Sequence, residues 1–97
     1  MKHYAMVHYR IRDFDQFKAE FEKVSPELPE FGFIHTWLHR SVDDPSEIVI
    51  VHECEDLALA RRFYNSDEYR QCIRDAGVVG EPNITYMEGL ESMPRAA

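Results

Sequence analysis

The sequence has few of the features that mark disulfide-rich, zinc-binding or membrane-spanning proteins. Its two cysteines, Cys54 and Cys72, are isolated and lack CxxC spacing, so neither a disulfide scaffold nor a structural zinc site is indicated. We interpret both thiols as reduced and the protein as cytoplasmic. Unbroken apolar runs such as residues 48–51 and 57–60 reach four residues, whereas a membrane-spanning helix needs roughly 20. No secretory leader is visible in residues 1–13.

Positive charge is also scarce. Eighteen Asp and Glu residues against eleven Lys and Arg give a formal net charge of −7, and the basic residues are scattered. Neutralising nucleic-acid phosphates requires clustered Lys and Arg, so we expect neither a nucleic-acid partner nor membrane association. A chain of 97 residues, 44% of them hydrophobic, has room for one core. We expect a single domain over residues 1–92 and a flexible tail over 93–97.

The first half of the chain predicts a strand followed by a helix and a second strand. Residues 3–12 are rich in Tyr, Val and Ile and end at Asp13, which suits a helix cap. A helix over residues 14–24 is predicted by apolar side chains at three- and four-residue steps, a stripe we interpret as core: Phe14, Phe17, Phe21 and Val24. Pro26 and Pro29 end this helix.

The second half predicts a hairpin, a helix and a last strand. Residues 33–40 and 47–54 are predicted strands joined by the polar turn 43–46. Asp56 can cap a helix, Ser66 can cap its continuation, and Gly77 is a suitable stop. Residues 83–90 supply the last strand, so the predicted order is βαββαβ.

The prediction of a dimer rests on the apolar run of residues 48–51. Ile48 and Ile50 point to one face of the strand while Val49 and Val51 point to the other. Two helices cover only one face of a four-stranded antiparallel sheet, the ferredoxin-like α+β arrangement. A second protomer packed on the other face would bury the remaining apolar patch and form a dimeric α+β barrel. The alternative is a monomer whose outer sheet face binds a ligand.

Three segments carry a resemblance to a known family. The hairpin DDPSEIVIVHE (43–53), Asp56-Leu57 and SDEY (66–69) resemble small dimeric α+β barrel proteins related to antibiotic biosynthesis monooxygenases. The segment AGVVGEP (76–82) is similar to a subgroup described as cyclase-like. Relatives include quinone-forming and haem-degrading monooxygenases and polyketide cyclases, so the resemblance implies the fold more firmly than the chemistry. It also implies a pocket between the sheet and the helices.

A histidine and several aromatic residues are the candidate site residues. His52 is the preferred acid or base, because an unperturbed imidazole permits either role. Tyr9 and Tyr69 are candidate proton or hydrogen-bond donors; the helix histidine of a related polyketide cyclase falls near Tyr69. Further candidates for contacting the substrate are His35, Trp37, Tyr86 and Cys54. The alternative for each of them is a packing role in the core or at the dimer interface.

Metal and haem sites have less support. His35 and His39 would lie roughly 13 Å apart on a strand, so they cannot bind one metal ion together. His35 and His52 can face each other across the hairpin, but no third metal ligand is evident. Haem-degrading relatives use a histidine that ligates the haem, a tryptophan and an asparagine. The resemblance places these three at Ile73, Cys54 and Tyr9, where this chain differs, so a haem-binding protein is the least favoured hypothesis. We therefore expect no cofactor.

The sequence thus leads to two main functional hypotheses. The first is a homodimer that binds a small apolar or aromatic molecule and acts as a cofactor-independent cyclase-like or monooxygenase-like enzyme on an aromatic or polyketide-like substrate. The second is a non-enzymatic binding or interaction module of the same fold. A cavity of about 300 Å³ or more, lined by His52 and Tyr9, would favour ligand binding or catalysis.

Overall fold

The computed structural model describes residues 2–94, which form a four-stranded antiparallel sheet in the strand order β2-β3-β1-β4. The strands are β1 (His3–Ile11), β2 (Phe33–Arg40), β3 (Glu47–Cys54) and β4 (Val78–Glu88). The helices are α1 (Phe14–Val24), α2 (Leu57–Tyr64) and α3 (Asp67–Asp75). The ferredoxin-like βαββαβ order is confirmed, with the second helical segment divided in two.

Short polar side chains begin each helix at the predicted positions. The Asp13 carboxylate accepts a hydrogen bond from the Gln16 backbone N–H at 3.0 Å, and Asp56 caps α2 in the same way. The Ser66 hydroxyl accepts the Tyr69 N–H at 3.1 Å. Because each such cap satisfies a backbone donor that the first turn leaves unpaired, these residues define where the helices start.

The prediction missed one short helical segment and misplaced the start of the last strand. The α-helix ends at Val24, but the two prolines lie inside a 3₁₀ segment, η1 (Ser25–Phe31), that continues to Gly32. Strand β4 begins at Val78 instead of Asn83. Gly80 adopts a φ of 75°, and the register between β1 and β4 shifts there. The strand therefore begins before this irregular position and continues through it. As an edge strand, β4 also tolerates a proline.

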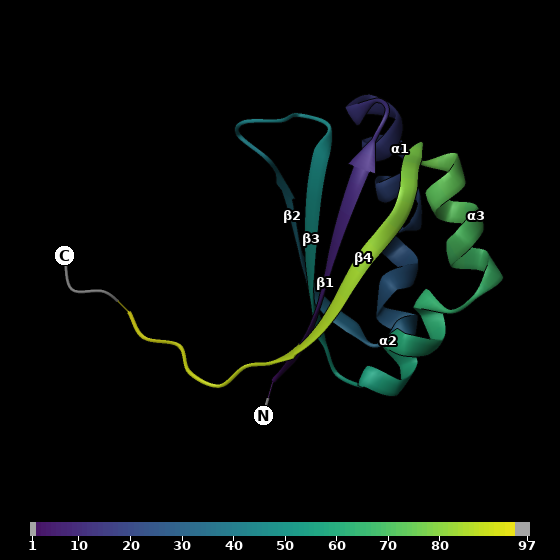
Figure 1. Cartoon of the computed structure of the whole chain (residues 1–97). Coiled ribbons are helices and arrows are strands. Elements are labelled where there is room, and N and C mark those ends of the chain that lie inside the picture. Colours follow the sequence, from purple (N-terminus) through teal and green to yellow (C-terminus); the bar gives the residue numbers. More distant parts are fainter. Residues whose placement is uncertain (1, 95–97) are drawn as a thin grey trace.

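All the helices lie on one side of the sheet, and the opposite face is bare in Figure 1. On β3, Ile48 and Ile50 are buried against the helices, whereas Val49 and Val51 point outward and are half-buried. This strand therefore has apolar side chains on both faces, as predicted. No segment of residues 2–94 covers the outer face, where 38% of Trp37 is exposed.

The chain leaves the sheet after β4 and extends away from it (Figure 1). Leu90 and Met93 on this segment are 80% and 77% exposed. Of the predicted tail, Met93 and Pro94 lie outside any helix or strand, and 95–97 lie outside the described residues. None of the helices found in residues 2–94 has the length and hydrophobicity that crossing a bilayer requires.

Candidate functional site

A small cavity lies between the inner face of the sheet and the helices, at the place that the resemblance predicts for a pocket. Its volume is about 60 Å³, well below the roughly 300 Å³ at which drug-sized ligand pockets begin. The walls are almost entirely apolar and aromatic, and Glu20 is the one acidic side chain among the described lining residues. The lining residues that matter below are Tyr9, Phe21, His52, Tyr64, Tyr69 and Ile73.

His52 reaches this cavity from β3 and is held in place by two neighbours. Its Nδ1 lies 2.7 Å from the Thr36 hydroxyl on the adjacent strand β2, and its ring stacks on Phe33 at a centroid distance of 4.2 Å. The side chain is 4% exposed, and burial lowers the pKa of His52 to about 4. The imidazole is therefore neutral at neutral pH, because a charged ring would lose its hydration without gaining a counter-ion.

Tyr9 and Tyr69 are joined by a buried hydrogen bond. Tyr9 comes from β1 and Tyr69 from α3, and their hydroxyl oxygens lie 2.6 Å apart. Each residue is 5% exposed. Burial raises the pKa of both phenols, so both remain protonated and one hydroxyl donates to the other. The pair can offer a hydrogen bond to a ligand, but it does not supply a base.

Tyr64 also lines the cavity, and sequence reasoning did not single it out as a site residue. It is 7% exposed, and its hydroxyl has no hydrogen-bond partner within residues 2–94. Burial raises the pKa of this phenol well above its ordinary range. A helical pattern over Leu57, Ala60 and Tyr64, at steps of three and four, could have placed it on the core face of α2.

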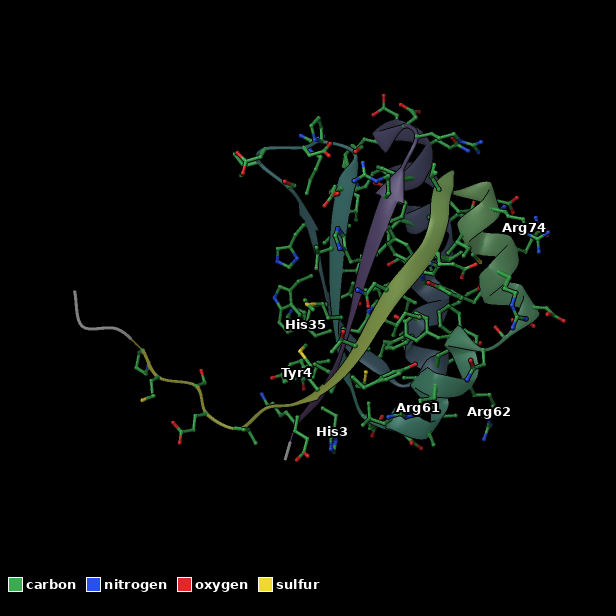
Figure 2. All side chains as sticks on the ribbon, in the orientation of Figure 1. His3, Tyr4, His35, Arg61, Arg62 and Arg74 are labelled. Atoms are coloured by element: carbon green, nitrogen blue, oxygen red, sulfur yellow. The ribbon has the colours of Figure 1, made fainter. Side chains whose placement is uncertain are left out.

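The predicted substrate contacts His35 and Trp37 lie on the other side of the sheet. Their rings stack at 4.0 Å with an interplanar angle of 9°, and Figure 2 shows His35 on the side away from the helices. In the register of β2 with β3, Thr36 pairs with His52 and His35 with Glu53. His35 and His52 therefore do not meet across the hairpin, since neighbouring strand residues point to opposite faces.

The other two predicted contacts, Cys54 and Tyr86, are on the inner side but outside the cavity wall. Cys54 is buried and its thiol lies 3.7 Å from the His52 carbonyl oxygen. The Tyr86 ring lies 4.1 Å below the guanidinium of Arg61, a residue of α2 that Figure 2 labels. Three of the seven predicted residues, Tyr9, His52 and Tyr69, thus share one cavity. Within residues 2–94 no cluster of side chains suited to a metal ion is present.

The fold and this cavity define a ferredoxin-like α+β protein with a small, aromatic, charge-poor site between its sheet and its helices. The sequence model of the family described as antibiotic biosynthesis monooxygenase matches residues 4–75. The chain belongs to that family. No curated protein matches its sequence.

Solved structures share the whole fold at low sequence identity. A protein from Bordetella bronchiseptica, classed with the antibiotic biosynthesis monooxygenases, has a TM-score of 0.79 and 14% identity over 93% of this chain and 98% of that chain. SnoaB, a cofactor-independent oxygenase from Streptomyces nogalater that was solved as a point mutant, has a TM-score of 0.75 and 13% identity over 97% and 98%. Rv0793 from Mycobacterium tuberculosis has a TM-score of 0.71 and 14% identity over 97% and 100%. At these identities the likeness establishes the fold.

Proposed function

We propose that the protein binds an aromatic or polyketide-like molecule between sheet and helices and acts on it as an oxygenase without metal or organic cofactor. The observation that carries this proposal is the neutral imidazole of His52, which shares an apolar cavity with the hydroxyls of Tyr9 and Tyr69. Membership of the family supports the reaction class, and SnoaB is described as an oxygenase of this kind.

The chemistry begins with removal of a proton from a phenolic or enolic hydroxyl of the substrate. His52 serves as the base in the tautomer whose Nδ1–H donates to Thr36, because Nε2 then has a free lone pair. The resulting electron-rich anion is oxidised by dioxygen. One oxygen atom enters the ring as a carbonyl and the other leaves as water, so a phenol plus O₂ gives a quinone plus H₂O. The negative charge that develops beside the imidazolium offsets the low basicity that burial imposes.

Binding requires the cavity to widen. A volume of about 60 Å³ is too small for a fused aromatic ring, so side chains in the wall must move. Phe21 and Ile73 are half-buried wall residues on α1 and α3, and a rotamer change there opens the cavity without disturbing the sheet. We therefore expect substrate binding to be accompanied by a change in the packing of the helices.

The homodimer remains our proposal for the outer face of the sheet. Val49 and Val51 lie at its centre, and Ile34 and Trp37 on β2 are 57% and 38% exposed. A second copy is the simplest cover, because the same face on both protomers is self-complementary about a two-fold axis. The stack of His35 on Trp37 would then belong to the interface and not to the cavity.

The second candidate function is binding without catalysis. It is favoured by the small cavity and by the contacts of His52, which is satisfied by Thr36 and Phe33 as a purely structural histidine would be.

Turnover of simple phenols separates the two candidates. Purified protein is incubated with 1-naphthol in air, and quinone absorbance and oxygen consumption are followed together. We expect His52→Gln to lower the rate by about 100-fold or more and His3→Gln, outside the cavity, to leave it unchanged. Binding of 1-naphthol with no turnover by the wild type supports the binding module. Turnover that survives His52→Gln in a folded variant overturns the role of His52.

A further inference from the structure

The hydroxyl of Tyr64 is the one buried side-chain polar atom within residues 2–94 that has no hydrogen-bond partner. Its neighbours are aromatic. The Tyr69 ring packs perpendicular to it at 4.9 Å, and the rings of Phe63 and Phe33 lie at 5.3 and 5.8 Å. The hydroxyls of Tyr9 and Tyr69 are paired with each other, and neither is paired with the Tyr64 hydroxyl. Tyr64 nevertheless lines the same cavity.

An unpartnered buried hydroxyl calls for an explanation, because most buried polar atoms in folded proteins are paired. A phenylalanine would fill the same aromatic site without the loss of hydration that the phenol suffers on burial. The position beside a cavity supplies the explanation, since a molecule placed there can accept the missing hydrogen bond. A protonated phenol is a donor to such a molecule.

The remaining polar groups indicate which molecule fits. Neither Lys nor Arg is among the described lining residues, and the acidic side chain is Glu20. A carboxylate or phosphate would lose its hydration here and meet no opposite charge. A neutral oxygen that accepts one hydrogen bond, attached to an aromatic body that packs on the surrounding rings, matches both the polarity and the walls.

We propose that the Tyr64 hydroxyl donates a hydrogen bond to the carbonyl oxygen of a neutral aromatic ligand bound in this cavity. The inference rests on the cavity being the binding site proposed above. It assigns Tyr64 as a specificity-determining residue that selects carbonyl compounds over hydrocarbons of the same shape, while the absence of Lys and Arg from the described wall disfavours anions.

Three ligands of nearly equal shape test this assignment. Acetophenone carries the carbonyl, α-methylstyrene replaces the carbonyl oxygen by CH₂, and benzoate replaces the methyl group by a charged oxygen. Dissociation constants are measured by NMR titration for the wild type, for Tyr64→Phe and for the control Tyr4→Phe on the outer face of β1. Melting temperatures are recorded for the same ligand-free proteins.

Tyr64→Phe is expected to weaken acetophenone binding about tenfold, which corresponds to about 1.4 kcal/mol, and to leave α-methylstyrene binding unchanged. Because it removes an unsatisfied hydroxyl, the variant should melt at the same or a higher temperature than the wild type, by up to about 8 °C. Tyr4→Phe should change none of the dissociation constants. Benzoate should bind the wild type at least about tenfold more weakly than acetophenone.

The other outcomes contradict the assignment in distinguishable ways. If Tyr64→Phe binds acetophenone as tightly as the wild type, the hydroxyl is not the donor, although the cavity remains the binding site. A lower melting temperature for Tyr64→Phe means that a buried water already satisfies the hydroxyl. Benzoate binding as tightly as acetophenone overturns the preference for neutral ligands. If none of the three binds the wild type, the proposed binding site itself fails.

Discussion

The buried hydrogen bond between Tyr9 and Tyr69 provides a quantitative test of how the cavity is held together. The two hydroxyl oxygens are 2.6 Å apart and both residues are 5% exposed. Changing either residue alone to phenylalanine leaves the other hydroxyl buried without a partner. That loss amounts to about 1–3 kcal/mol, and in a domain of about 100 residues each kcal/mol lowers Tm by about 4–8 °C.

The decisive comparison is between the double variant and the two single variants. Tyr9→Phe combined with Tyr69→Phe removes both hydroxyls, so no unsatisfied group remains and the net loss should be below about 1 kcal/mol. Urea unfolding followed by circular dichroism, at one fixed protomer concentration, gives the free energy of unfolding for all four proteins. If the double variant loses as much as the two single variants added together, the hydroxyls do not depend on each other and the reasoning is refuted.

Two further predictions concern pH and assembly. Burial lowers the pKa of His52 from 6.5 to about 4. Between these two pH values the unfolded chain therefore binds more protons than the folded protein. The free energy of unfolding should fall by about 3 kcal/mol as the pH drops through that window. Urea unfolding should show about 2 kcal/mol of this loss between pH 7 and pH 4.5. An equally steep loss in His52→Gln would contradict the prediction. Val51→Asp places a charge on the outer sheet face and should convert the dimer into an 11.5 kDa monomer, which sedimentation at micromolar concentration detects. The control Val42→Asp, at a turn residue that is 99% exposed, should leave the dimer intact. Sedimentation of the wild type as a monomer would remove the basis of this prediction.

Local patterns were sufficient for most of the elements. The bounds of β2, β3 and α1 coincide with the predicted ranges, because a polar turn separates the two strands and the apolar stripe of α1 has a helical period. The start of β4 was predicted at Asn83, beyond Gly80 and Pro82, two residue types that usually weaken or interrupt a strand. Pairing with β1 extends β4 back to Val78, and that pairing is a tertiary contact that no local pattern contains.

The candidate site was predictable only in part. Strand alternation placed His52 on the same face as Ile48 and Ile50, but the prediction still grouped it with His35 and Trp37, which the observed register places on the other face. It did not reveal that Thr36 faces His52 across the hairpin, because that depends on the register shift after Phe33. Tyr64 was overlooked for a similar reason, since an unsatisfied hydroxyl is visible only when every neighbouring atom is placed.

The sequence by itself determined the order of the elements and the two apolar faces of β3, because side-chain alternation along a strand follows from the pleat of the backbone alone. Only the tertiary structure decided which side chains meet. Tyr9 and Tyr69 are sixty positions apart, and their contact depends on how α3 docks on β1. Packing of this kind arises from the summed shapes of many side chains, and so it sets the size and polarity of the cavity where no short motif can.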